Sequence, residues 1–163
     1  MGSFKNKCME SVKEMQENSR ETTDLGGEMQ EQAEQINQVL DGIQLQDDED
    51  ISAVSDTKGS YQKSFDSAFT EQVETAGQEI ETQGEQLRSE ISAEQGNVRS
   101  GIQSMERAGG VSEIGRDAAD AGRNKLEQSE REYEGIANDA ERVVDDTAQK
   151  IEQLKSSVNR VFG

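Results

Sequence analysis

Apolar residues recur at alternating steps of four and three along residues 3–46. Small or hydroxylated residues, Ser19, Thr22 and Gly26, continue the same register through the middle of the stretch. A seven-residue period of this kind predicts a helix that packs with left-handed supercoiling on a partner helix. Because the register is kept across Gly26-Gly27, we expect one helix with a weak or kinked point there. The apolar positions are Cys8, Val12, Met15, Met29, Ala33, Ile36, Leu40 and Ile43.

The period changes to eleven residues over 50–107. Such a spacing predicts a nearly straight or slightly right-handed helix with close to 3.67 residues per turn. Gly84, Gly96 and Gly101 lie inside this stretch, where they indicate close helix approach or local weakness. The first series is Val54, Phe65, Ala76, Leu87 and Val98, and the second is Phe69, Ile80, Ile91 and Ile102. The preceding acidic run, residues 46–50, favours a chain reversal followed by a helix N-terminus.

A third helical stretch is predicted over 112–162. Ala108-Gly109-Gly110 ends the second stretch, Ser112 is the expected N-cap, and Val111 is expected to pack as an apolar staple. The apolar positions are Ile114, Ala118, Ala121, Leu126, Tyr133, Ile136, Ala140, Val143, Ile151, Leu154, Val158 and Val161.

Together these patterns predict an all-α fold with three long helices over 3–46, 50–107 and 112–162. Short reversals favour an up-down-up order, so we expect one domain spanning 1–163, an elongated antiparallel bundle of coiled-coil type. Self-association is the other way to cover the apolar faces.

Composition agrees with long helices around a thin core. The chain has no proline, which long uninterrupted helices exclude. Only 30% of the residues are hydrophobic and 4% aromatic, against 32% charged, so the composition alone approaches that of disordered chains. The periodicity of the apolar residues favours helices over disorder. We expect low isolated stability, with a partner or oligomerisation completing the core.

The formal net charge is −18, from 17 basic and 35 acidic residues. Such a chain repels nucleic acid and anionic lipid, so neither is an expected partner. The expected partner is protein, either a helical partner or a second copy, in a homo- or hetero-oligomer. The N-terminus has no apolar core of a signal peptide and no stretch approaches a membrane span. We therefore expect cytoplasmic synthesis, and any export to proceed without a cleavable signal.

Candidate chemistry is sparse. Without histidine, neither a Ser-His-Asp triad nor a histidine-ligated metal site can form. Cys8 lies among the apolar positions and is expected to be a small core residue. Asp47 does not start a calcium-binding EF-hand loop, because Ser52 stands where that loop needs glycine. No phosphate-binding glycine motif is present. We assign no catalytic, cofactor or metal residues and expect no enzyme.

Leu40-Asp41-Gly42 ends the first helical stretch, just before the expected reversal. It resembles the Leu-x-Gly and Trp-x-Gly helical-hairpin families of type VII secretion substrates, whose triplet lies near the bend between two amphipathic helices. The resemblance covers roughly residues 1–100 and implies a domain that pairs with a small helical partner and presents a composite export signal. The families' C-terminal Tyr-x-x-x-Asp/Glu signal is absent, because Ala137 follows Tyr133 and Phe65 follows Tyr61 at the fourth position.

The leading functional hypothesis is a non-catalytic secretion-targeting or adaptor module of a toxin system exported in this way. The alternative is a self-assembling structural coiled coil or scaffold, and a signalling helix ranks below both. The residues expected at the partner interface or in the core seam are Leu40, Gly42, Phe65, Phe69, Ile80, Leu87, Ile91, Val98 and Tyr133.

Overall fold

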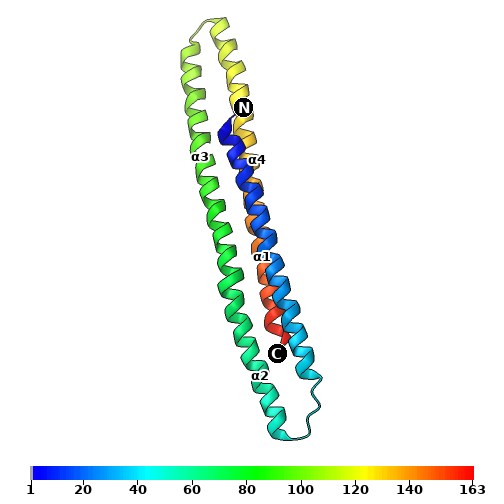
Figure 1. Cartoon of the computed structure of the whole chain (residues 1–163). Coiled ribbons are helices and arrows are strands. Elements are labelled where there is room, and N and C mark those ends of the chain that lie inside the picture. Colours follow the sequence, from blue (N-terminus) through cyan, green and yellow to red (C-terminus); the bar gives the residue numbers. More distant parts are fainter. Residues whose placement is uncertain (1) are drawn as a thin grey trace. The chain divides into compact units, whose positions relative to one another are not determined.

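The computed structural model describes residues 2–163 and is all-α, as predicted. Three long helical segments pack antiparallel: α1, then α2 joined through a π-helical turn to α3, then α4 (Figure 1). The elements are α1 Ser3–Asp41, α2 Asp48–Phe69, the π-helical turn η1 Thr70–Glu74, α3 Thr75–Gly109 and α4 Glu113–Val161.

The predicted helix limits are close to the observed ones except at the first reversal. α1 ends at Asp41 instead of residue 46, so Ile43 lies outside the helix and is 45% exposed rather than part of the apolar face. Asp47 is the N-cap of α2, and the next three residues are the acidic first turn. Carboxylates at this end interact favourably with the positive end of the helix dipole, which confirms the predicted helix start.

The chain packs as two compact units. Unit 1 comprises Met1–Met15 and Thr82–Val143, and unit 2 comprises Gln16–Glu81 and Val144–Gly163. Each unit holds parts of α1, α3 and α4, and unit 2 also holds α2 and η1. The single domain expected over 1–163 stays a prediction.

The core of unit 2 contains an apolar cluster. Its buried members come from α1, the α2–η1 junction and α4, and they are Met29, Phe69, Val73, Ile151 and Val158. Gly26 lies within the continuous α1, as predicted, and a Cβ placed there would be 2.9 Å from Leu154 Cδ1. The glycine therefore lets α1 and α4 approach closely instead of weakening α1.

The stretch with the eleven-residue spacing contains a local widening of the helix, the π-helical turn η1. Phe69, just before η1, and Val73, within it, are both buried, at 1% and 0% exposure. Thr75 Oγ1 donates a hydrogen bond to the carbonyl of Thr70, five residues earlier, at 3.2 Å. A π-helical turn accommodates one extra residue. The α2–α3 segment is therefore not the uninterrupted helix that the spacing alone predicts.

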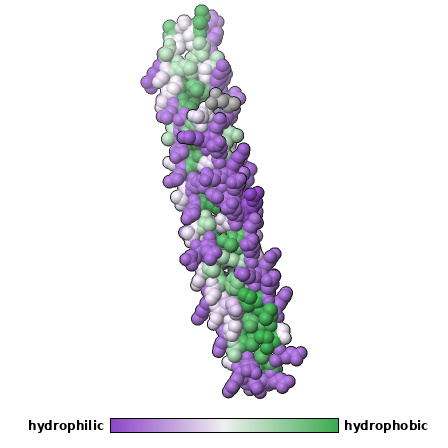
Figure 2. All heavy atoms as spheres, viewed as in Figure 1, coloured by the Kyte–Doolittle hydropathy of each residue, from purple (hydrophilic) through white to green (hydrophobic). Residues whose placement is uncertain are grey.

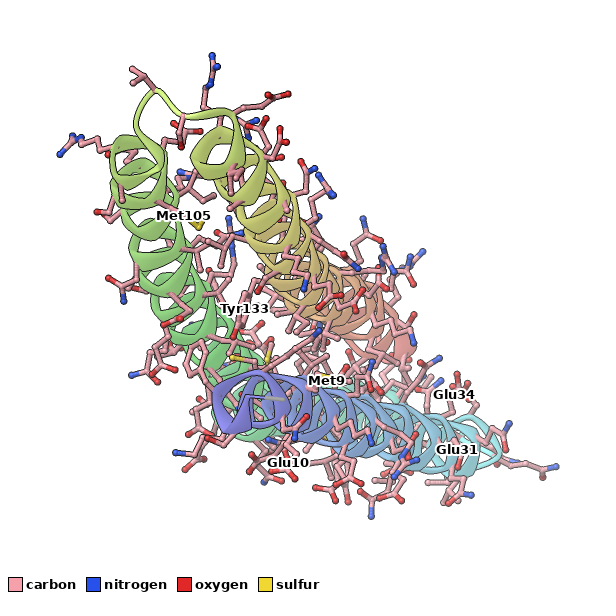
Figure 3. All side chains as sticks on the ribbon, turned by 90° about the horizontal axis from the view of Figure 1, so that it is seen from above. Met9, Glu10, Glu31, Glu34, Met105 and Tyr133 are labelled. Atoms are coloured by element: carbon pink, nitrogen blue, oxygen red, sulfur yellow. The ribbon has the colours of Figure 1, made fainter. Side chains whose placement is uncertain are left out.

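The core of unit 1 is formed by residues of α1, α3 and α4. Cys8 is 1% exposed, which confirms its predicted core position, and Leu87 and Ile91 of α3 are also buried. Phe4 and Tyr133 pack ring against ring with centroids 5.8 Å apart. On α3, Met105 faces α4, where a Cβ at Gly122 would lie 2.6 Å from its sulfur (Figure 3).

The α3–α4 turn corrects several expectations. Ser112 caps α4 as predicted, because its Oγ accepts the Gly115 N–H at 3.0 Å. Val111 is 93% exposed and Ile114 is 84% exposed, so the apolar staple and the start of the third apolar face are wrong. A Cβ at Gly115 would collide with the carbonyl oxygen of Gly109. This backbone contact sets the rotation of α4.

That rotation also changes which small residues of α4 face inward. Ala119 is 7% exposed, whereas the predicted Ala118 and Ala121 face solvent. Gly96 and Gly101 of α3 have open space where a Cβ would stand, so the close approach considered for them is also wrong.

Candidate interaction surfaces

Most of the residues expected at an interface or in the core seam lie inside their own unit. The exposed fraction is 1–4% for Phe69, Ile80, Leu87 and Ile91, and 8% for Tyr133. These five pack within the chain. The remaining residues are reachable: Leu40, Phe65 and Val98 are half-buried, and Gly42 is exposed.

Leu40-Asp41-Gly42 lies at the end of α1. The Gly42 N–H donates to the carbonyl of Gln38 at 2.9 Å, which closes the last turn of the helix. Lys58 of α2 forms an ion pair with Asp41 at 2.5 Å across the reversal. The triplet is therefore fixed at the bend between α1 and α2, in unit 2.

Apolar side chains surround this bend without being covered. Val39 is 68% exposed, Ile51 is 51% exposed and Ile43 is 45% exposed. Phe162, just after α4, stacks on Tyr61 of α2 with ring centroids 5.9 Å apart. Asp48–Ser60 precedes Tyr61 in α2 and spans about 20 Å at 1.5 Å per residue toward the bend (Figure 1).

A groove of about 360 Å³ between α1 and α2 lies next to this end. Its apolar floor consists of Leu25, Met29, Phe65 and Ala68, and its rim includes Glu28 and Glu31 together with glutamines of α1 and η1. Figure 2 shows apolar residues gathered near the end of α1 and the C-terminus. We call the groove and the bend residues Val39, Leu40, Ile43 and Ile51 together the hairpin strip.

Sequence reasoning missed several core residues that matter here. Val73, in η1, has 0% exposure but falls outside both eleven-residue series. Thr147 is 1% exposed, and its hydroxyl pairs with that of Ser19 at 2.5 Å. Phe162 also packs against Phe65, with ring centroids 5.9 Å apart. A signal was present for Val73 and Thr147, since each lies four residues before or after a position already assigned to an apolar face.

The single thiol offers little chemistry. Burial raises the pKa of Cys8, and the carboxylates of Glu90 and Glu94 raise it further, so the reactive thiolate is disfavoured. Burial likewise raises the pKa of Tyr133, with Glu94 as the next cause. Within residues 2–163, no three carboxylate or thiol side chains are placed to hold a metal ion. None of the helices in the described chain is long and apolar enough to cross a membrane.

Comparison with protein-family models, curated proteins and solved structures finds no match to this chain.

Proposed function

We propose that this chain is a non-catalytic helical interaction module, and that it acts as a secretion-targeting or adaptor domain of a type VII-type exported toxin system. One observation carries the proposal. Leu40-Asp41-Gly42 lies at the α1–α2 bend, and the apolar residues Val39, Ile43 and Ile51 stand exposed around it.

The exposed apolar residues at the bend support a helical partner. Met29 and Phe69 of this hairpin are buried together with residues of α4, whereas Val39, Ile43 and Ile51 stay exposed. An amphipathic helix of a partner protein laid along the hairpin strip supplies an apolar face that covers them. A partner helix that covers Val39, Leu40 and Ile51 contributes roughly 1.5–3 kcal/mol for each fully buried side chain.

The proposal is tested on export and partner binding together. The tagged chain is expressed in the cells that naturally produce it, and two amounts are measured: chain in the medium, and small helical proteins recovered with the chain by mass spectrometry. We expect Leu40→Asp with Ile43→Asp to lower both about tenfold, which corresponds to about 1.4 kcal/mol. Circular dichroism is expected not to change, because both residues lie at the end of the hairpin.

Val111→Asp is the matched control. It puts the same charge on an exposed apolar residue at the α3–α4 turn, and it leaves the hairpin strip intact. Export and recovery that stay unchanged in the Leu40/Ile43 variant, or that fall equally in the control, contradict the proposal.

A self-assembling structural protein is the alternative, and the same exposed residues support it, since a second copy also brings a helix that covers them. Self-association places two chains of net charge −18 side by side, which opposes it at low salt. Sedimentation equilibrium separates the two functions. A mass that rises with concentration and returns to that of the monomer in Leu40→Asp/Ile43→Asp favours self-assembly.

A further inference from the structure

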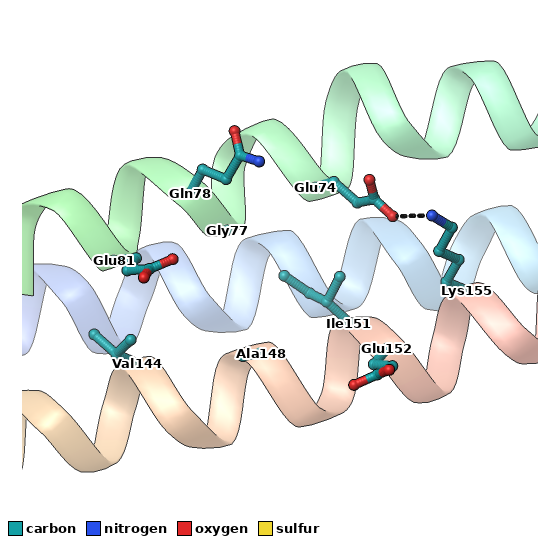
Figure 4. A pocket seen from close by; sticks show the side chains of 9 residues that line it. All are labelled: Glu74, Gly77, Gln78, Glu81, Val144, Ala148, Ile151, Glu152 and Lys155. Atoms are coloured by element: carbon teal, nitrogen blue, oxygen red, sulfur yellow. Dashed lines mark ion pairs between the residues drawn. The ribbon is translucent and has the colours of Figure 1, made fainter.

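A second groove lies on unit 2, between α3 and α4, and it shares no lining residue with the hairpin strip. It encloses about 310 Å³. Its floor is made of small and aliphatic residues, with Gly77 on α3 and Val144, Ala148 and Ile151 on α4 (Figure 4). A Cβ placed at Gly77 would lie 2.5 Å from Ile151 Cδ1, so the glycine brings the two helices close and keeps the floor shallow.

The α4 residues of the floor form a second stripe on that helix. Val144, Ala148, Ile151 and Lys155 follow at steps of four, three and four, which is the spacing of one helix face. Ile151 is buried, Val144 is half-buried and Ala148 is exposed. Thr147 and Val158 belong to the core beside this stripe. The stripe therefore carries apolar surface outward from the core of unit 2 and leaves it uncovered.

The walls of the groove are acidic. Glu74 pairs with Lys155 at 2.6 Å, and this hydrogen bond is the largest cause of the raised pKa of Lys155 (Figure 4). Glu81 and Glu152 line the groove on opposite helices, and neither has an ion pair within residues 2–163. The groove thus has a net charge of −2, from three carboxylates and one ammonium group.

We propose that this groove binds a basic amphipathic helix of a partner protein. Small or short apolar residues along one stripe of that helix cover Val144 and Ala148, and lysine or arginine side chains beside the stripe reach Glu81 and Glu152. The groove as a whole spans Val144–Lys155 along α4, about 16 Å at 1.5 Å per residue, which is close to three turns of a docked helix. This is the helix-in-groove mode of recognition.

Charge selects this occupant over a second copy. The chain carries −18 overall, and a second copy adds further carboxylates to walls that already hold two unpaired ones. A basic helix neutralises both. The inference goes beyond the proposed function, because the groove lies on the α3–α4 face and uses none of the residues of the hairpin strip.

The test uses the full chain and a fluorescein-labelled helical peptide of about eighteen residues, built from alanine and leucine on one stripe with flanking lysines. A second peptide has glutamate at each lysine position. Binding is followed by fluorescence anisotropy at physiological salt. We expect the basic peptide to bind and the acidic one not to bind.

Two variants locate the binding. Ala148→Arg places a long cation on the floor, and Glu81→Lys with Glu152→Lys reverses the unpaired walls; each is expected to weaken the basic peptide about tenfold or more. The matched controls are Ala121→Arg, at an exposed alanine of the same helix, and Glu79→Lys with Asp146→Lys, exposed on the same two helices but outside the groove. The controls are expected to change the affinity less than about twofold.

If Glu81→Lys/Glu152→Lys and its control Glu79→Lys/Asp146→Lys weaken binding of the basic peptide equally, net charge alone attracts the peptide. That result overturns the proposal. Absence of peptide binding to the unaltered chain overturns it as well. Circular dichroism of every variant shows whether it folds. If Ala148→Arg fails to fold, the charge-reversal pair, which lies on the rim, decides. A mass that doubles at working concentration and falls back in the Ala148→Arg chain identifies a second copy as the occupant and also overturns the proposal.

Discussion

Replacing Leu87 by aspartate tests the core of unit 1 between α1 and α3. Leu87 is 4% exposed and lines a recess together with Phe4 and Cys8. Removing a buried leucine side chain costs about 2–5 kcal/mol. The new carboxylate adds a desolvation cost of at least about 1–3 kcal/mol, because Glu90 is close by and of the same sign.

The sum, about 3–8 kcal/mol, compares with a total stability of about 5–15 kcal/mol for a typical domain. We therefore expect Leu87→Asp to lose most of its cooperative unfolding transition and part of its helical circular dichroism signal. Urea unfolding followed at 222 nm measures the loss. Leu87→Ala, which removes the apolar contacts without adding a charge, is expected to fall between this variant and the unaltered chain.

Val111→Asp is the control within the same unit, since Val111 is 93% exposed and the substitution is expected to stay within about 0.5 kcal/mol. If Leu87→Asp lowers the free energy of unfolding by less than about 1 kcal/mol, Leu87 is not a core residue. The assigned packing of α1 on α3 would then be refuted.

Three further outcomes are expected. Thr147→Val removes one partner of the hydroxyl pair with Ser19 and should cost about 1 kcal/mol in urea unfolding, whereas the double variant with Ser19→Ala should cost less than the sum of the single changes. A fully additive cycle would show that the pair carries no energy. Gly115→Ala should destabilise by about 1–3 kcal/mol, because the new methyl group meets the Gly109 carbonyl, whereas Gly96→Ala has free space and should stabilise by about 0.5–1 kcal/mol; equal effects would contradict the close α3–α4 contact. The raised pKa of Cys8 keeps the folded thiol neutral at a pH where the unfolded thiol already ionises, so stability is fully present below the usual thiol pKa and is lost as the pH rises through the folded pKa. Alkaline urea titrations of the unaltered chain and of Cys8→Ala should therefore converge as the pH rises, and a parallel course would disprove the linkage.

The sequence by itself determined the class of fold and most of the helix limits. Apolar residues at helical spacing, together with the absence of proline, leave few alternatives to long helices. The acidic run at 47–50 and Ser112 mark helix starts through local capping and dipole effects, which act within one turn. The bend at Leu40-Asp41-Gly42 was predictable from a local signal too, because Gly42 directly follows the last turn of α1.

Only the tertiary structure decided which residues of the predicted apolar faces are covered. Val111 and Ile114 continue a helical apolar pattern, yet the contact between Gly109 and Gly115 turns them outward. Leu40 belongs to the same face of α1 as Met29, yet Met29 is buried and Leu40 is only half-buried. Periodicity records which side of a helix is apolar. It does not contain the packing of one helix against another, which leaves grooves open between α1 and α2 and between α3 and α4.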